Sequence, residues 1–428
     1  MIKIYDFSNS IDNTVIKNLT NRSKLENKDV EATVSEIIYN VKMHGDRALF
    51  DYTLKYDGVE IDDKNIMVEK KEIDDAYSKV DKEFISALRN AIKNITEYHE
   101  NQRQKTWLDF KGGIVYGQKI RPLEKVGIYV PGGTASYPSS VLMNSIPAKV
   151  AGVDEIVMVT PVKAGLNPFV IVAANEVGIN KIYKIGGAQA IAALAFGTES
   201  IPKVDKIVGP GNIFVAMAKR AVYGYVDIDM VAGPSEVLIV ADESGNPTYL
   251  AADLLSQAEH DAMASAVLIT TSKSIAEKVA EEVSRQTLYL ERKDIINKSL
   301  EDYGAIIIVN NLEDALNIAN EIAPEHLELD IKNPFEMIGM VKNAGAIFLG
   351  ENSPEPLGDY IAGPNHVLPT SGTSRFFSPL SVDDFIKKMS ILYYDENSLK
   401  NVSDDIVRLA EAEGLTAHAN SIKVRFKR

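Results

Sequence analysis

The segment LLSQAEHDA, at residues 254–262, carries two side chains that could begin a metal site. Gln257 and His260 are three residues apart, so their side chains share one face if the segment is helical. A histidine with a second donor atom one turn away is a common start of a zinc site. A solvated helix face with a surface histidine has the same spacing, and spacing alone favours that simpler interpretation.

Two neighbouring residues in the segment APEHLEL, at residues 323–329, could form an acid–base couple. Glu325 and His326 follow a proline at the point where an apolar alternation begins. Adjacent residues on a strand point to opposite faces, whereas in a turn both side chains could address one pocket. A carboxylate beside a histidine suits proton transfer near neutral pH. An exposed pair without catalytic importance is the alternative interpretation.

Four further polar residues lie in loop-like segments. Ser235 stands between a Gly-Pro turn and an expected strand, where it either donates a hydrogen bond at a site or only forms the turn. Asp359 belongs to a loop rich in Gly and Pro at residues 353–376, and long loops of this kind usually carry function. Glu413 and His418 lie near the C-terminus, where a solvated tail is the simplest interpretation.

The composition excludes several kinds of site. The chain has no cysteine, so disulfides, thiolate metal sites, iron–sulfur clusters and a cysteine nucleophile are ruled out. The net charge of −14 argues against nucleic acid or an anionic membrane surface as the main partner. The N-terminal sequence MIKIYDFSNS lacks the features of a signal peptide, and no apolar run reaches about 18 residues, so we expect a cytoplasmic protein without a membrane span.

Short apolar runs alternate with helical patterns through the middle of the chain. The runs are near-continuous, which is typical of parallel strands buried on both faces. One eight-stranded barrel would also use this alternation, but we prefer two open, largely parallel sheets because Gly-rich turns cluster after the first four strands. The expected strands are residues 126–130, 155–160, 181–185, 206–208, 237–242, 266–270, 305–309 and 346–350.

The two ends of the chain are expected to differ from this α/β region. Residues 1–24 are polar and could form an arm or a short helical appendage. The tripeptide His44-Gly45-Asp46 indicates a helix end followed by a new N-cap. His99, near the end of a second long helix, has charged neighbours and is expected to be solvated. The C-terminal part is expected to be mainly helical, over residues 382–392 and 404–413.

Three Gly-rich segments follow expected strands. They are VPGGTASYPSS after Val130, IGGAQAIAALAFG after Ile185 and VGPGN after Val208. Glycines at the carboxyl ends of strands permit a close approach of backbone to a ligand, and a helix N-terminus there can bind phosphate. The dinucleotide fingerprint G-x-G-x-x-G is absent. Each turn alone also fits an ordinary connection, but the three together favour a nucleotide or phosphate site.

Taken together, the motifs of this chain resemble the histidinol dehydrogenase family. The resemblance spans nearly the whole sequence, and several independent motifs occur in the family's order. It replaces the simpler interpretations of Gln257, Glu325 and His418, but not those of His44 and His99. The motifs are VGIYVPGGTASYPSSVLMNSIPAKVAGV, IGGAQAIAALAFGT, KIVGPGN, VAGPSEVLIVAD, DLLSQAEHD, IAPEHLEL, GDYIAGPNHVLPTSGTSRF and EGLTAHANS.

The resemblance implies a homodimeric zinc enzyme that oxidises L-histidinol to L-histidine through the aldehyde, in two NAD⁺-dependent steps that end histidine biosynthesis. It implies one Zn²⁺ per subunit and a C-terminal segment that completes the partner's site. The implied zinc ligands, which also lie at the substrate, are Gln257, His260, Asp359 and His418. The other implied residues are Ser235, His326 and Glu413 for the substrate, Tyr129, Gln189 and Asn212 for NAD, and Glu325 and His326 for catalysis.

With the resemblance, the expected fold has two Rossmann-like α/β domains with largely parallel sheets, a small N-terminal arm and a helical C-terminal segment. Residues 25–128 and 237–378 would form the main domain, which carries the metal and the catalytic residues. Residues 129–236 would form the second domain, which contacts NAD. Residues 1–24 would be the arm, and residues 379–428 the dimerisation segment.

The chemistry of such a reaction can be followed from the residues. An aldehyde must first form a tetrahedral adduct before it can release hydride, and without a cysteine that adduct must come from water. Glu325 is the natural group to activate this water, and His326 is the candidate base. Two other classes stay open: a zinc hydrolase in which Glu325 activates metal-bound water, and a noncatalytic two-lobed binding protein.

Overall fold

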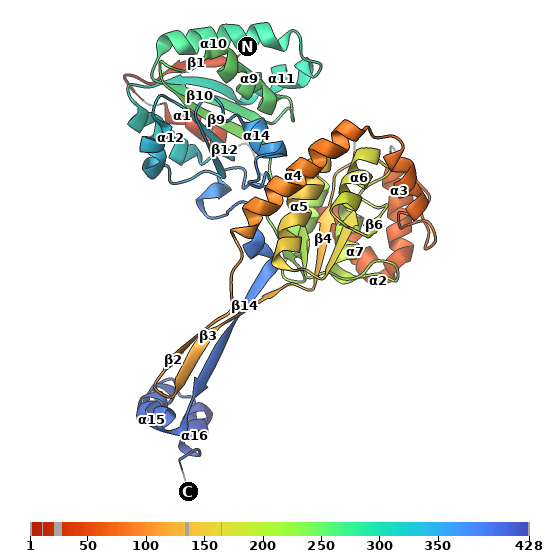
Figure 1. The fold of residues 1–428 in the computed structure, drawn as a ribbon, viewed down its shortest axis with the longest axis vertical. Coiled ribbons are helices and arrows are strands. Elements are labelled where there is room, and N and C mark those ends of the chain that lie inside the picture. Colours follow the sequence, from red (N-terminus) through yellow and green to blue (C-terminus); the bar gives the residue numbers. More distant parts are fainter. Residues whose placement is uncertain (1, 11, 21–27, 133–136, 164, 427–428) are drawn as a thin grey trace. The chain divides into compact units, whose positions relative to one another are not determined.

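The structure is a computed structural model that describes residues 2–10, 12–20, 28–132, 137–163 and 165–426 (Figure 1). The chain forms two compact units. The first unit comprises residues 1–102 and 123–385, and the second comprises residues 103–122 and 386–428. Within the described residues, no helix has both the length and the apolar character needed to cross a membrane.

A six-stranded parallel sheet forms one part of the first unit, with the strand order β1-β11-β10-β9-β12-β13. Every residue of β9, β10, β11 and β12 is buried, because helices cover both faces of the sheet. The strands are β1 (Lys3–Asp6), β9 (Glu236–Ala241), β10 (Ser265–Thr270), β11 (Gly304–Ile308), β12 (His326–Asp330) and β13 (Ala346–Leu349).

Two groups of helices bury the faces of this sheet (Figure 1). On one face lie α9 (Pro247–Ala258), α10 (Lys273–Thr287) and α11 (Lys293–Tyr303). On the other face lie α1 (Asn13–Thr20) and α12 (Leu312–Ile322). Two short helices flank β13 in the sequence: α13 (Pro334–Met337) precedes it and α14 (Glu355–Tyr360) follows it. Turns of 3₁₀ helix occur at Ile338–Met340, Thr373–Arg375 and Val382–Phe385.

A five-stranded parallel sheet forms the other part of the first unit, with the order β6-β5-β4-β7-β8. Its strands are β4 (Lys125–Tyr129), β5 (Glu155–Val159), β6 (Lys181–Tyr183), β7 (Lys206–Val208) and β8 (Asp227–Ile228). One face packs on α3 (Lys70–Tyr77), α4 (Lys82–Glu100), α5 (Pro138–Ala151) and α6 (Pro168–Glu176). The other packs on α2 (Lys28–Asp57), α7 (Gly187–Phe196) and α8 (Ile213–Val222).

The expected strands are confirmed, and they form two open parallel sheets rather than one barrel. The expected break at Gly45 is also confirmed, because this residue has φ 55° and ψ −136° inside α2. In place of an arm, residues 3–6 form β1, which pairs with β11 at the edge of the six-stranded sheet. We expected α2 to α4 to join residues 237–378, but these helices pack on the helices of the five-stranded sheet.

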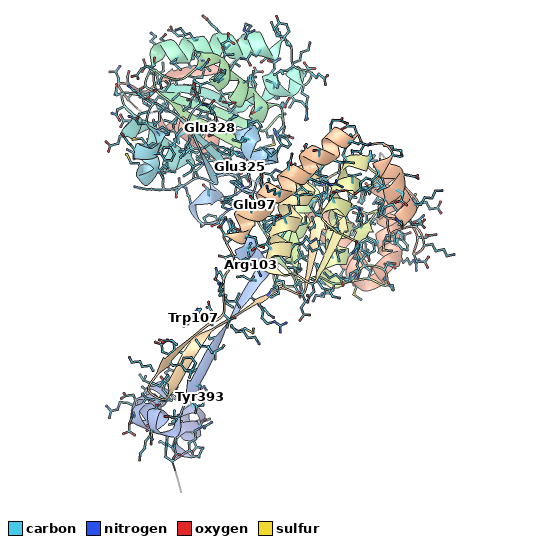
Figure 2. The ribbon with its side chains drawn as sticks, in the orientation of Figure 1. Glu97, Arg103, Trp107, Glu325, Glu328 and Tyr393 are labelled. Atoms are coloured by element: carbon cyan, nitrogen blue, oxygen red, sulfur yellow. The ribbon has the colours of Figure 1, made fainter. Side chains whose placement is uncertain are left out.

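The second unit is a three-stranded antiparallel sheet with two helices. β3 (Ile114–Pro122) pairs with β2 (Trp107–Lys111) on one side and β14 (Ile386–Tyr394) on the other, and α15 (Glu396–Ala412) and α16 (Thr416–Lys423) follow. Figure 2 shows Trp107 on β2 and Tyr393 on β14. The helix expected over residues 382–392 is wrong, because β14 pairs with β3 along its whole length. The helix expected over residues 404–413 is confirmed within α15.

Candidate active site

A cluster of three ligand-type side chains in the first unit could hold a metal ion. The ligand atoms of His260, Glu355 and Asp359 all lie within 4.8 Å of one another. His260 follows the end of α9, whereas both carboxylates come from α14, where a spacing of four residues puts them on one helix face. The cluster therefore joins two segments that are far apart in the sequence.

Gln257, three residues before His260, is a fourth possible ligand. It lies in the last turn of α9, and its backbone C=O accepts the N–H of His260 at 3.2 Å. The side chain is fully buried, and both its Oε1 and its Nε2 lack a hydrogen-bond partner in the described part of the chain. Because a buried amide without partners costs free energy, this amide fits a site completed by a bound group. An amide oxygen, an imidazole and two carboxylates are a donor set suited to Zn²⁺.

Glu325 and His326 lie at the amino end of β12, where both residues are buried. The Oε2 atom of Glu325 accepts the backbone N–H of Glu236 at 2.8 Å, and the Nδ1 atom of His326 lies 3.0 Å from the backbone oxygen of Glu236. Because a carbonyl oxygen can only accept, Nδ1 carries the hydrogen in this bond. In the neutral imidazole, Nε2 is therefore the atom that is free to take a proton.

The same imidazole connects the two clusters. The Nε2 atom of His326 is buried without a hydrogen-bond partner among the described residues, and it lies 3.8 Å from Oδ1 of Asp359. The backbone oxygen of Asp359 in turn accepts from Nδ1 of His366 at 3.1 Å. The imidazole of His326 and the possible metal ligands thus share one site, and a small molecule between them would meet both.

Burial and neighbouring charges together shift the pKa values of this site. Burial raises the pKa of the Glu325 carboxyl to about 8. Burial alone would lower the pKa of His326, but the carboxylates of Glu325 and Asp359 outweigh that effect and raise it to about 10. Burial also raises the pKa of Glu355 to about 7, whereas His326 and His366 outweigh burial at Asp359 and lower its pKa.

A cavity of about 360 Å³ opens beside His260. It is lined by Tyr137 and Ser139 at the start of α5, and by Arg292 and Tyr360 on the side of the six-stranded sheet. The guanidinium of Arg292 also donates to the backbone oxygen of His260 at 3.4 Å. A small polar molecule bound here would reach the His260 side chain.

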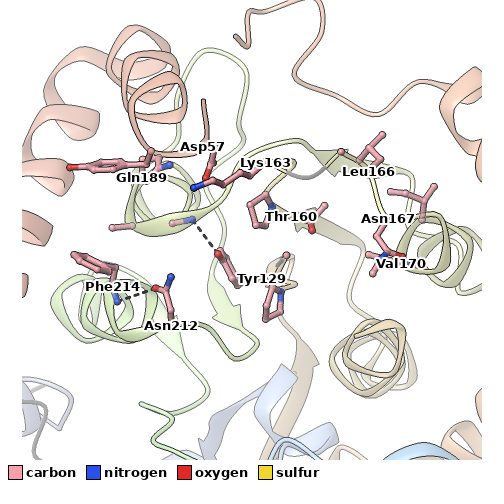
Figure 3. Close-up of a pocket in the computed structure, with 18 of the residues that line it drawn as sticks. Asp57, Tyr129, Thr160, Lys163, Leu166, Asn167, Val170, Gln189, Asn212 and Phe214 are labelled. Atoms are coloured by element: carbon pink, nitrogen blue, oxygen red, sulfur yellow. Dashed lines mark hydrogen bonds between the residues drawn. The ribbon is translucent and has the colours of Figure 1, made fainter. Parts of the chain in front are cut away.

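A larger cavity of about 740 Å³ lies at the carboxyl ends of the strands of the five-stranded sheet (Figure 3). Tyr129, Gln189 and Asn212 all line it, so the three residues expected at NAD come together in one pocket. Its volume falls within the range of small-molecule and cofactor sites. Gly132, Gly187 and Asn212, one residue from each of the three Gly-rich segments, all line this cavity.

Hydrogen bonds to backbone groups hold two of these three side chains, those of Tyr129 and Asn212. The hydroxyl of Tyr129 accepts the backbone N–H of Gly187 at 3.2 Å. Asn212 is the N-cap of α8, and its Oδ1 accepts from the N–H groups of Phe214 and Val215, so Nδ2 is its remaining donor. The buried Gln189 side chain has an Nε2 atom without a hydrogen-bond partner within the described residues. Two amide donors therefore line this pocket.

The remaining expected residues have different positions. Ser235 is half-buried directly before β9, and its backbone oxygen accepts from Ser265 at 3.0 Å. Glu413, at the end of α15, and His418, on α16, are exposed residues of the second unit. The cluster described in the first unit therefore does not include them. Glu355 is a candidate ligand that the sequence analysis missed, although its spacing of four from Asp359 was visible.

Comparisons with known proteins decide the family. Residues 20–426 match the family described as histidinol dehydrogenase. The chain belongs to that family. It is 67% identical to histidinol dehydrogenase of Caldanaerobacter subterraneus subsp. tengcongensis over 427 residues, which cover 100% of this chain and 99% of the relative. It is 62% identical to histidinol dehydrogenase of Clostridium acetobutylicum over 414 residues, with 96% of each chain covered.

A solved structure gives the same assignment. The crystal structure of histidinol dehydrogenase from Elizabethkingia anophelis superposes with a TM-score of 0.93 at 39% sequence identity, covering 99% of this chain and 98% of that one. The expected family and the α/β fold with largely parallel sheets are thus confirmed. The chain is an oxidoreductase of the histidinol dehydrogenase family, whose substrate is histidinol.

Proposed function

We propose that the chain oxidises L-histidinol to L-histidine in two NAD⁺-dependent steps through L-histidinaldehyde, with one Zn²⁺ in each subunit. One observation carries this proposal. The possible metal ligands His260 and Asp359 lie in the same site as Glu325 and His326, which could act as an acid–base couple. The pocket lined by Tyr129, Gln189 and Asn212 supports the use of NAD, whose nicotinamide accepts hydride in both steps.

Gln257, His260 and Asp359 would hold the zinc ion together with His418 of the partner subunit. When bound, zinc would anchor and orient the imidazole and amino groups of the substrate. The unpartnered side-chain amide of Gln257 and the short distances between the ligand atoms of His260 and Asp359 support this assignment. We propose Glu355 as a further residue of the same ligand set, because its carboxylate lies within reach of both.

In the first step, His326 would remove the hydroxyl proton of histidinol. Its Nδ1–H is held by the backbone oxygen of Glu236, so its Nε2 faces the site as the proton acceptor. Nearby carboxylates raise the pKa of this imidazole. A cation held by Asp359 would offset their charge and would favour the neutral imidazole that a base requires.

In the second step, Glu325 would activate the water that adds to the aldehyde. The chain has no cysteine, so no thiol can form the adduct. Burial raises the pKa of Glu325 to about 8, which suits a group that takes and returns a proton near neutral pH. His326 would then act as the base again while the hydrate releases its hydride.

We propose that the enzyme is a homodimer in which Glu413 and His418 complete the partner's site. The second unit exposes large apolar side chains, including Phe110 and Leu392, each 72% exposed, and Leu409 on α15. Exposed apolar side chains gathered on a small unit are typical of a subunit interface. Mixing Glu325→Gln subunits with His418→Ala subunits should restore the formation of histidine from histidinol, which neither variant completes alone, because a mixed dimer keeps one intact site. No recovery after subunit exchange would overturn the shared site.

The deciding experiment counts NADH formed per L-histidinol consumed, with a chelator and after zinc is added back. Two NADH per substrate, lost on chelation and restored by zinc, is the expected result. One NADH with free aldehyde would contradict the coupled second step. No NADH together with substrate turnover would support the zinc hydrolase instead.

A further inference from the structure

A carboxylate that the reaction does not use lies in the wall of the 740 Å³ cavity. Asp57 is the last residue of α2, and its Oδ2 atom is buried without a hydrogen-bond partner in the described part of the chain. A negative charge at a helix C-terminus is unfavourable, because the carbonyl groups there already carry partial negative charge. Burial adds to this cost and raises the pKa of Asp57. The fold thus keeps a costly carboxylate at the pocket without a partner for this oxygen.

The surroundings of Asp57 belong to the same pocket. Figure 3 shows Asp57, Lys163 and Gln189 on one side of the cavity and Asn212 with Phe214 on the other. Lys163 is near enough to attract the carboxylate, but among the described residues no ion pair within 4.0 Å joins the two. After burial, the charge of Asp57 is also one of the causes that raise the pKa of Tyr129 to about 12. The carboxylate of Asp57 is therefore close enough to influence the pKa of the Tyr129 hydroxyl in the same cavity.

We propose that Asp57 accepts hydrogen bonds from the hydroxyls of the adenosine ribose of NAD and makes this pocket select NAD over NADP. The inference rests on the proposed use of NAD. A ribose offers two neighbouring O–H donors, and a carboxylate with a free oxygen is the acceptor that matches them. In NADP the 2′-oxygen carries a phosphate, which brings negative charge against the carboxylate and removes one donor. Such an unfavourable contact is an effective way to reject a competing ligand.

The apolar residues of this cavity would accommodate the adenine ring, with its ribose beside Asp57. Ile37, Tyr56, Leu166 and Ile171 line the same cavity, and an adenine ring needs such apolar and aromatic walls. Lys163 is the one described cation in the lining, and its attraction for a 2′-phosphate opposes the effect of Asp57. Asp57 would thus favour NAD and Lys163 would favour NADP, and an experiment can separate the two effects.

The first test compares Asp57→Asn with the unchanged enzyme in steady-state NADH and NADPH formation from histidinol. We expect the KM for NAD to rise roughly tenfold or more, because hydrogen bonds to a charged group are lost, while kcat changes little. The ratio of kcat/KM for NAD to that for NADP should fall at least about tenfold. Asp51→Asn, an exposed residue of the same helix outside the cavity, is the matched control and should change neither value.

The second test measures the binding of ADP and of nicotinamide mononucleotide by calorimetry, without histidinol. If Asp57 holds the adenosine ribose, Asp57→Asn weakens ADP binding and leaves nicotinamide mononucleotide unchanged. Weakening of nicotinamide mononucleotide alone, or an unchanged preference for NAD in an active Asp57→Asn enzyme, would overturn the inference. Failure of the unchanged enzyme to form NADH from histidinol would instead overturn the proposed function. Thermal unfolding of Asp57→Asn checks that the variant folds.

Discussion

Glu236 and Glu325 exchange hydrogen bonds between neighbouring strand segments. The carboxylate of Glu325 accepts the backbone N–H of Glu236 at 2.8 Å, and the carboxylate of Glu236 accepts the backbone N–H of Glu325 at 3.2 Å. Glu236 also holds His326 through its backbone oxygen. Because β9 and β12 are adjacent and parallel, this exchange fixes both members of the proposed acid–base couple to the rigid sheet. Rigid support of this kind is what precise proton transfer requires.

Glu325→Gln should slow the oxidation of the aldehyde about a hundredfold or more, and the oxidation of the alcohol much less. A glutamine keeps an oxygen that can accept the N–H of Glu236, so the fold should be retained, but it cannot take a proton from water. Single-turnover experiments that start from histidinol or from histidinaldehyde separate the two steps. If only the alcohol step were slowed, the assignment of Glu325 to water activation would be wrong.

His260→Ala should reduce bound zinc from one per subunit to nearly none after dialysis, and histidinol binding should be lost with it.

Glu355→Gln should weaken zinc affinity about tenfold to a hundredfold, since its carboxylate lies among the ligand atoms. Metal analysis of dialysed protein measures both effects. Glu351→Gln, an exposed acid before α14, is the control and should keep its zinc. Full zinc content in His260→Ala would exclude His260 as a ligand.

The sequence predicts strands well where apolar residues are continuous, as in β9, β10 and β11. It fails at β1 and β14, which are largely exposed and lack such a run. Their extended state depends on pairing with β11 and β3, far away in the chain, and a local pattern contains no information on such a partner. The packing of α2 on α7 and α8 was missed for the same reason.

Among the site residues, too, some could be predicted from the sequence and others could not. Gln257 and His260 could be recognised as a pair from helical spacing, but only the family motifs separated them from an exposed helix face. The segment PEPLGDY appears loop-like because of its two prolines and its glycine, yet prolines are tolerated in the first turn of a helix, where α14 begins. Glu355 and Asp359 consequently share a face that the sequence analysis did not consider.

Lys219 and Asp229 form a buried ion pair behind the turn that carries Asn212. Lys219 also donates to the backbone oxygen of Gly209 at 2.9 Å, and Asp229 accepts the N–H of Gly209 at 2.9 Å. Gly209 has φ 110°, and a Cβ there would lie 2.2 Å from the backbone oxygen of Tyr129, so only glycine fits. The ion pair thus fixes a turn beside the 740 Å³ cavity, where we propose that NAD binds.

Lys219→Met should therefore lower the free energy of unfolding by about 3–5 kcal/mol, because it leaves the Asp229 carboxylate buried without its partner. The KM for NAD should rise as the turn loosens. The double variant Lys219→Met with Asp229→Leu should recover part of the stability, since no charge then stays unpaired. Denaturant unfolding of both variants measures this difference. Equal stability of the single and double variants would show that the unpaired charge is not the cause.

His99→Gln should remove part of the acid sensitivity of folding. From the charged neighbours in the sequence we expected a solvated His99, but the residue is fully buried. Its Nδ1 lies 2.7 Å from Oε1 of Gln102, and its Nε2 faces the amide of Asn365. Burial lowers its pKa below 6.5, so the unfolded chain binds a proton that the folded chain resists. Stability from this residue is complete above pH 6.5 and is lost as the pH falls, by at most about 1.4 kcal/mol per pH unit for one proton.

Thermal and denaturant unfolding between pH 5 and 7.5 test this linkage. The unfolding free energy of the unchanged chain should fall more steeply below pH 6.5 than that of His99→Gln. His44→Gln is the matched control, because His44 is exposed on α2 and its removal should leave the slope unchanged. An identical slope in His99→Gln and in the unchanged chain would mean that the acid sensitivity arises elsewhere. A shallower slope in His44→Gln alone would have the same meaning, because the acid sensitivity would then not come from His99.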